Sequence, residues 1–225
     1  MDLRLALTST GAVREFTDEP VSDELLREVL GDARFAPSGG NRQPWRVAVI
    51  TDPVLRRAVR DAYLDAWHDY VAHHLVGLTP FAPTASAPER RAVAERRGDA
   101  MALSRSDGFP ETLDRAPAML AVAADLSVLA ATDRDLDRFP LVAGASVYPF
   151  VWSILLAARE RGLGGVITTV ATAREVHLRP VLGLAPDAAL AAIVILGWPR
   201  VAPTRLRRRD VAEFSTRDRF DGPPL

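Results

Sequence analysis

The stretch Ala33-Arg34-Phe35-Ala36-Pro37-Ser38-Gly39-Gly40-Asn41-Arg42-Gln43-Pro44-Trp45 joins an amphipathic helical segment to an apolar, strand-like one. Pro37 has no backbone donor, so it can neither continue the helix nor lie inside a sheet. Gly39-Gly40 permits backbone angles that other residues avoid and lets the main chain approach a ligand closely. Asn41 and Gln43 then offer amide donors and acceptors with one residue between them. We expect this loop to hold something flat with polar edges.

The composition is typical of an ordinary soluble globular protein. Of the 225 residues, 48% are hydrophobic and 25% charged, and the net charge of −1 argues against a nucleic-acid surface. The lack of cysteine excludes disulfides, thiolate nucleophiles and cysteine-ligated metals, and the lack of lysine excludes Schiff-base chemistry. No signal-like segment opens the chain and no apolar run reaches ~18 residues, so we expect a cytoplasmic protein without membrane spans.

Hydrophobic periodicity predicts a mixture of helices and strands in irregular order. We expect helices near residues 3–9, 22–36, 53–74, 89–102, 144–162 and 173–182, and strands at 45–50, 118–125, 166–170 and 189–196. The strands at 45–50, 118–125 and 189–196 are predicted to be buried. No glycine-rich turn follows an early strand, which favours an α+β fold with a mixed sheet over a doubly wound fold.

The helix at 144–162 is apolar on nearly every side. Val151, Ile154 and Leu155 mark one face, while Trp152 and Leu156 leave the other face apolar too. Such a helix must be covered all round, and in a chain of this size a subunit interface is one plausible cover.

Three candidate sites each have a structural explanation beside a functional one. The arginines at 205 and 207–209 are either a solvated charge run or a phosphate site, for which guanidinium groups suit the geometry. Arg14 either pairs with a nearby acid on the surface or meets a ligand. Trp67 and Tyr70 belong either to the core or to the wall of a substrate pocket.

Metal and hydrolase chemistry have weak support in the sequence. His73 and His74 are adjacent, so on a helix their side chains point in different directions, and we predict no metal site. Ser38 lacks the G-x-S-x-G setting of a hydrolase nucleophile.

Taken together, four ordered motifs resemble the nitroreductase family of FMN-dependent oxidoreductases. The motifs are Val13-Arg14-Glu15-Phe16-Thr17, Ala36-Pro37-Ser38-Gly39-Gly40-Asn41-Arg42-Gln43-Pro44-Trp45, Gly162-Leu163-Gly164 and Leu196-Gly197-Trp198-Pro199. The resemblance covers residues 10 to about 210. It implies an α+β fold with a mixed, mostly antiparallel sheet flanked by helices, a single domain over residues 1–225, and an intertwined homodimer. The tail from about residue 200 would reach over the partner subunit.

The resemblance also implies a function and a set of site residues. Hydride would pass from NADH or NADPH through FMN to a nitroaromatic, quinone or related small-molecule acceptor in a ping-pong cycle, with no catalytic side chain because the flavin carries the chemistry. Arg14 would lie near the pyrimidine edge of the flavin or its ribityl chain, and backbone donors of Thr168 and Thr169 near N5. The expected cofactor-binding residues are Arg14, Pro37, Ser38, Gly39, Asn41, Gln43, Thr168, Thr169, Arg205 and Arg207, and the expected substrate-pocket residues are Trp67, Tyr70 and Phe150.

One departure from the family pattern concerns the phosphate of FMN. Family members usually carry arginine and serine where this chain has Thr10-Gly11-Ala12. Either the tail arginines compensate, or the phosphate is held differently, with Gly11 letting backbone amides meet it. A weaker hold on FMN or use of a deazaflavin follows as an alternative. Two other functions stay open: a non-catalytic flavin-binding or flavin-sequestering dimer, and chemistry redirected to flavin fragmentation or dehalogenation.

Overall fold

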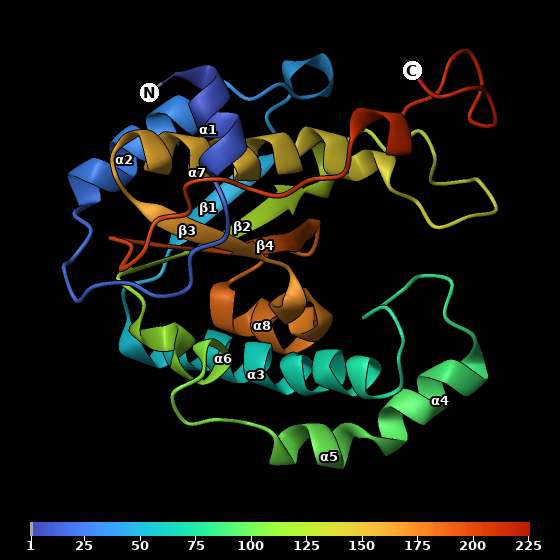
Figure 1. Ribbon diagram of the computed structural model, residues 1–225. Coiled ribbons are helices and arrows are strands. Elements are labelled where there is room, and N and C mark those ends of the chain that lie inside the picture. The colour runs from blue at the N-terminus through green and yellow to red at the C-terminus, as the bar shows by residue number, and fades with distance from the viewer. Residues whose placement is uncertain (1) are drawn as a thin grey trace.

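A four-stranded antiparallel sheet forms the middle layer of the protein. The computed structural model describes residues 2–225. The strands are β1 (Trp45–Val49), β2 (Ala118–Asp125), β3 (Gly164–Thr168) and β4 (Ala188–Gly197), arranged in the order β1-β2-β4-β3. Helices cover the sheet from both sides (Figure 1), so the predicted α+β fold is confirmed.

On one side of the sheet, α2 (Asp23–Ala33) and α7 (Tyr148–Glu160) pack together, with α1 (Leu3–Ser9) beside them (Figure 1). Ser22 caps α2 by accepting a hydrogen bond from the amide of Leu25, as its type and position predict. The buried residues of this layer include Val29, Ile154 and Leu120, and they form one continuous core.

On the other side lie α3 (Pro53–Leu75), α6 (Phe109–Thr112) and α8 (Glu175–Leu182) (Figure 1). Their core includes Val59, Tyr63 and Leu178 together with alternate residues of β2 and β4. Because neighbouring side chains of a strand point to opposite faces, Met119 belongs to this core and Leu120 to the other. The two central strands are therefore covered on both faces, which explains their continuous apolar sequences.

The prediction that residues 45–50 form a buried strand was wrong about burial. The strand itself forms, but β1 lies at the edge of the sheet, where Arg46 and Ala48 are exposed and Val49 is 39% exposed. An apolar run alone does not distinguish a central strand from an edge strand, because the difference lies in which distant segment pairs beside it.

Two predicted helices are divided in the structure. Residues 89–102 form α4 (Ala87–Glu95) and α5 (Arg97–Ala102), which are separated at Arg96 and lie below α3 in Figure 1. Residues 142–160 form a 3-10 turn, η4 (Val142–Ser146), followed by α7. The remaining short turns are η1 (Gly39–Asn41), η2 (Leu113–Arg115), η3 (Leu126–Val128), η5 (Val170–Arg174) and η6 (Val211–Glu213). None of the helices in residues 2–225 is both long and apolar enough to cross a membrane.

An extended strip from Ala12 to Thr17 lies along the outer edge of β3 and the end of β4. Ala12 pairs in parallel with Gly165, and the amide of Val13 donates to the Gly165 carbonyl at 2.8 Å. Farther along, the amide of Thr17 donates to the Trp198 carbonyl at 2.8 Å. This strip covers one edge of the sheet and carries Arg14 to the end of β3.

Candidate functional site

A pocket of about 240 Å³ lies between β3 and α3. Arg14 enters it from the N-terminal strip and Thr168 from the end of β3. The remaining lining residues are mostly aromatic or apolar: Tyr63, Trp67, Tyr70, Phe109, Pro110, Val166, Ile167 and Val170. The structure thus brings Arg14, Thr168, Trp67 and Tyr70, all proposed as site residues, to one place.

The aromatic wall of the pocket follows from the spacing of three residues on α3. Tyr63, Trp67 and Tyr70 are separated by four and three positions, so they share one face of the helix. The rings of Trp67 and Tyr70 stack at 4.7 Å with an interplanar angle of 8°, and those of Tyr63 and Trp67 lie 6.1 Å apart at 12°. This row of nearly parallel rings gives the pocket an aromatic, largely apolar side. Trp67 and Tyr70 are thus partly buried and line the pocket as well.

Arg14 faces the pocket because its neighbour Val13 faces the core. Val13 is 5% exposed and lies directly over Gly164, where a Cβ would come within 2.8 Å of its side chain. Adjacent residues of an extended segment point to opposite sides, so Arg14 projects outward, with its guanidinium 5.9 Å from the ring centre of Phe109. In residues 2–225, no carboxylate lies within ion-pair distance of Arg14. The pocket therefore holds a cation free to meet an anionic group.

Tyr63 is the most deeply buried aromatic residue of the wall, with 3% of its surface exposed. Burial raises the pKa of its phenol, while the Thr168 side chain and the charge of Arg14 act in the opposite direction. The raised pKa keeps the hydroxyl neutral near pH 7, so Tyr63 serves the pocket as a hydrogen-bonding group and not as an anion.

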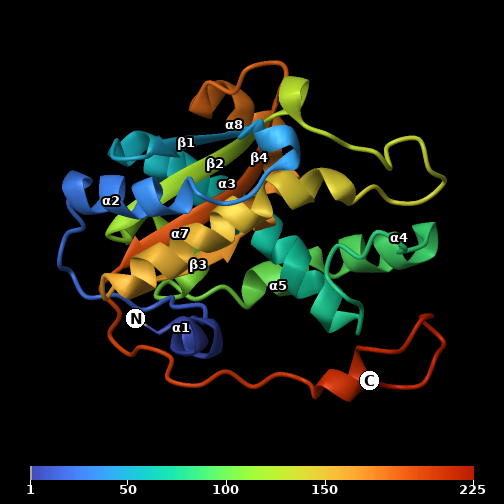
Figure 2. The ribbon, with the colours of Figure 1, turned by 90° about the horizontal axis from the view of Figure 1, so that it is seen from above.

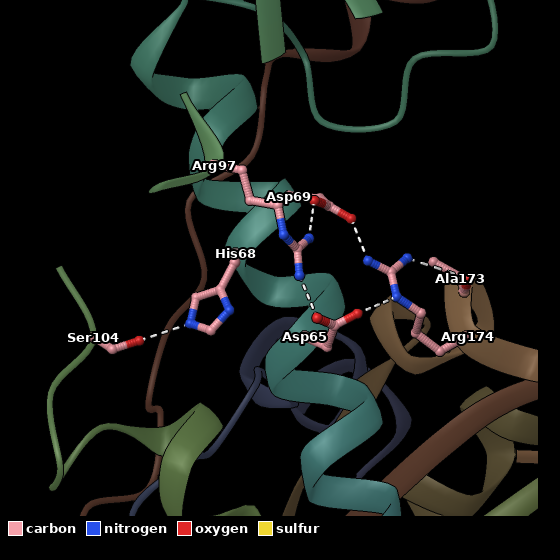
Figure 3. Close-up of polar contacts among 7 residues, drawn as sticks. All are labelled: Asp65, His68, Asp69, Arg97, Ser104, Ala173 and Arg174. Carbon is pink, nitrogen blue, oxygen red and sulfur yellow. Dashed lines mark hydrogen bonds and ion pairs between the residues drawn. The ribbon is translucent and has the colours of Figure 1, made fainter. Parts of the chain in front are cut away.

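A ring of ion pairs fastens the segment after Thr168 to α3 (Figure 3). Arg174, in η5, and Arg97, in α5, each bond to both Asp65 and Asp69 of α3. Burial opposes ionisation of Asp65, but hydrogen bonds and charge from Arg174 and Arg97 outweigh it and hold its pKa below the usual value. The sequence does not point to these four residues, because charged side chains on an outer helix face usually contact only water. Asp65 and Asp69, four positions apart on one face, were the available signal.

The loop from Ser38 to Gln43 lies on the opposite side of the sheet from this pocket. The amide of Gly39 donates to Ser146 Oγ at 3.0 Å, just before α7. Within the loop, the amide of Gln43 donates to Ser38 Oγ at 2.9 Å, and Gln43 Nε2 donates to Asn41 Oδ1 at 3.2 Å. Asn41 and Gln43 have positive φ values of 53° and 49°, which non-glycine residues rarely adopt. One chain alone does not bring this loop to Arg14.

The expected phosphate residues Arg205 and Arg207 lie beside α1, away from both the loop and the aromatic pocket. They line an open hollow together with Arg4 and Thr8. Thr169, in turn, is exposed just beyond Thr168. The predicted set is therefore divided among three regions of the chain: the pocket at β3, the loop that contains η1, and the hollow at α1.

Phe150, predicted to line a substrate pocket, is placed in the core instead. It is 2% exposed, and its ring stacks on that of Trp45 with centroids 4.6 Å apart and an interplanar angle of 0°. Its position explains the apolar start of α7 as packing against β1. A substrate contact by Phe150 stays a prediction, without support from this position.

Comparison with known proteins gives the site a family context. The Nitroreductase family model matches residues 8–198. A nitrobenzene nitroreductase of Ectopseudomonas oleovorans is 30% identical over 194 residues, which cover 83% of this chain and 82% of that protein. An NADH dehydrogenase of Thermus thermophilus is 30% identical over 199 residues, covering 88% and 87%. A 5,6-dimethylbenzimidazole synthase of Rhodospirillum rubrum is 29% identical over 188 residues, covering 84% and 77%.

Solved structures share the fold. An iodotyrosine deiodinase crystallised with FMN and 3-iodo-L-tyrosine superposes with a TM-score of 0.61 at 23% identity, covering 92% of this chain and 95% of that one. At this level of identity the likeness concerns the fold alone.

Proposed function

Because the chain belongs to the nitroreductase family, we propose that it is an FMN-dependent oxidoreductase. Hydride would pass from NADH or NADPH through the flavin to a nitroaromatic, quinone or related acceptor in a ping-pong cycle. One observation carries the proposal: Arg14 and Thr168 line the same pocket, beside a row of stacked aromatic rings.

The residues present fit FMN. Its ring is flat and apolar with a polar edge, which suits a pocket of stacked aromatic residues beside a guanidinium group. Its phosphate needs cations some distance away, and the strip from residue 10 to residue 14 spans about 13 Å at ~3.3 Å per residue. Arg14 stands at one end of this strip. The arginine-lined hollow lies beyond the other end, next to Thr8. We therefore assign Arg14 and the Thr168-Thr169 segment to the ring and Arg205 and Arg207 to the phosphate.

The bound flavin would supply the two-electron chemistry, and the chain's own residues would set the conditions for it. Arg14, with no carboxylate partner in residues 2–225, would stabilise negative charge that develops at the pyrimidine edge during reduction. Tyr63, Trp67 and Tyr70 would exclude water from one side of the pocket. Thr168, 8% exposed, would be held in place by the ion pairs of η5 with α3.

A homodimer completes the proposal. The Ser38–Gln43 loop and the pocket at β3 lie on opposite sides of the sheet, so a second copy is needed to bring such a loop to each pocket. Apolar side chains without cover in one chain support an interface: Leu3, Leu5 and Leu7 on α1, and Phe35 beside the loop, are each more than half exposed. In this proposal the tail from about residue 200 reaches over the partner.

The test is a spectrum of the purified protein followed by anaerobic addition of NADH or NADPH. We expect an oxidised-flavin spectrum, or its appearance on adding FMN, and bleaching by at least one nicotinamide. A colourless protein that takes up no FMN contradicts the proposal. A yellow protein that no nicotinamide reduces and that shows no turnover favours a flavin-sequestering dimer instead.

The relative that is a 5,6-dimethylbenzimidazole synthase supports flavin fragmentation as a second candidate. This candidate is tested with the protein, reduced FMN and oxygen: loss of flavin with release of a benzimidazole supports fragmentation, whereas simple reoxidation to intact FMN supports the oxidoreductase. Release of iodide from an iodinated tyrosine would identify dehalogenation in the same way.

A further inference from the structure

The hollow beside α1 brings together arginines from the two ends of the chain. Arg4 and Thr8 lie four positions apart on α1, and Arg205 and Arg207 come from the tail that passes it (Figure 2). The amide of Leu206 donates to the carbonyl of Thr8 at 2.9 Å, which fixes the tail against the end of α1. The two arginines that flank Leu206 are thereby held next to the helix that carries Arg4.

The tail packs closely against Gly11. A Cβ at this position would lie 2.8 Å from Leu206 Cδ2 and 3.3 Å from Pro203 Cγ, so a larger residue would require the Leu206 side chain to move. Arg159 Nη2 donates to the Pro203 carbonyl at 3.2 Å and holds the same segment from the side of α7. Gly11 belongs to Thr10-Gly11-Ala12, the segment that lacks the usual arginine and serine of the family. The departure from the family pattern and the packing of the tail are therefore linked.

The arginines of the hollow differ in their partners from three arginines elsewhere in the protein. Arg97, Arg161 and Arg174 each bond to two carboxylates. For Arg4, Arg205 and Arg207, no carboxylate of residues 2–225 lies within ion-pair distance. These three exposed guanidinium groups carry the same charge and repel one another, and an anion bound between them would offset that repulsion. Phosphate, with several acceptor oxygens, suits such a set.

We propose that Arg4 binds the phosphate of FMN together with Arg205 and Arg207, and so takes over from the arginine that this chain lacks at Thr10. The inference rests on the proposed flavin function and adds a residue to it. Arg4 is exposed, so its loss should affect the ligand more than the fold.

The experiment compares FMN with riboflavin, which has the same ring and no phosphate. Apoprotein is titrated with each flavin, and quenching of flavin fluorescence gives the dissociation constant for the wild type, Arg4→Ala, Arg4→Lys and the control Arg91→Ala. Arg91 is an exposed arginine on α4, so the control makes the same change of charge far from the hollow (Figure 1).

We expect Arg4→Ala to weaken FMN binding roughly tenfold and leave riboflavin binding unchanged, because one charge-assisted contact to phosphate is lost. Arg4→Lys should recover part of the loss, and Arg91→Ala should match the wild type. An unchanged affinity of Arg4→Ala for FMN, or an equal loss for both flavins, overturns the assignment while leaving the flavin function intact. A wild type that binds neither flavin overturns the proposed function and this inference with it.

Discussion

Arg174 and Asp69 form a hydrogen-bonded ion pair although 105 residues separate them in the chain. Their side chains are only 20% and 23% exposed. Asp65 and Arg97 complete the ring, which connects α3, α5 and η5 (Figure 3). Since η5 begins two residues after Thr168, this ring ties the β3 side of the pocket to the α3 side.

Arg174→Ala should destabilise the protein by about 1–3 kcal/mol, between the small value of an exposed ion pair and the larger one of a buried pair. The removal leaves two carboxylates of α3 short of a partner. Thermal unfolding measures the loss. Arg174→Lys keeps the charge but cannot bond to both carboxylates as a guanidinium does, so its unfolding temperature should lie between those of the wild type and Arg174→Ala. Arg57→Ala, at an exposed position of α3, is the control. An unfolding temperature of Arg174→Ala equal to that of the control would contradict a role for the ring.

His68 should make the protein less stable as the pH falls below its ordinary pKa of 6.5. Burial lowers the pKa of His68 in the folded protein, and the charge of Arg97 lowers it further. Between the folded and unfolded pKa values the unfolded chain binds the extra proton, so acidification favours unfolding, and the loss ends below the folded pKa. The carboxylates that act against this shift are Asp65, Glu111 and Asp69.

Urea unfolding between pH 7 and pH 5 measures this dependence, with His68→Gln as the comparison. Gln keeps a donor toward Ser104 Oγ, which lies 2.8 Å from His68 Nε2, and does not titrate. The slope of stability against pH over this range should be smaller in His68→Gln. Parallel slopes would show that another group is responsible.

Arg14→Ala should lower the midpoint potential of bound flavin, because the cation that favours the anionic reduced form is lost. The measurement is a spectroscopic redox titration against a reference dye. Arg14→Lys should retain part of the effect. If neither variant shifts the potential, Arg14 acts only at the surface and its assignment to the ring is wrong.

Arg205→Ala should weaken FMN retention by about 1.5–3 kcal/mol, the usual contribution of a hydrogen bond to a charged group. Equilibrium dialysis of the holoprotein measures retention. The paired variant is Arg200→Ala, an exposed arginine that precedes the hollow and does not line it. Equal retention by both variants would remove Arg205 from the phosphate site.

Tyr70→Ala should raise the KM for aromatic acceptors about twofold to tenfold, because a stacking partner worth roughly 0.5–1.5 kcal/mol is lost from the pocket wall. Stability should change little, since Tyr70 is only partly buried.

Phe150→Ala should instead lower the free energy of unfolding by about 3–5 kcal/mol, because Phe150 is buried, and should leave the KM for acceptors unchanged. A Phe150 variant that stays stable but changes acceptor preference would restore its predicted place in the pocket.

The sequence predicted local structure better than the relations between distant segments. The sequence predicts the strands at 118–125 and 189–196 to be buried because nearly every residue in them is apolar, including those that point to opposite faces of the sheet. β1 lies at the edge because it pairs with β2 alone, and the residues of β1 do not show how many strands pair with it. Likewise, no proline near Arg96 indicates that α4 ends and α5 begins there.

The same distinction applies to the candidate site. The family motifs predict Arg14 and Thr168 as site residues, and the pairing of Ala12 with Gly165 brings both residues to one pocket. That pairing joins segments far apart in the chain, and hydrophobic periodicity does not predict such pairings. The sequence does not point to Arg4 for a similar reason. Its segment has the pattern of an ordinary short helix, and only the tail packed against Gly11 places Arg205 and Arg207 beside it.

The strip at residues 12–17 also has a consequence for how the protein is made. Its hydrogen-bond partners, Gly165 and Trp198, are synthesised late, so a growing chain carries Arg14 on an unpaired segment for most of its translation. Helices α2 and α3 can form from local sequence as they emerge, but the pocket cannot exist until β3 and β4 have left the ribosome. We therefore expect cofactor uptake to follow chain release and not to accompany elongation.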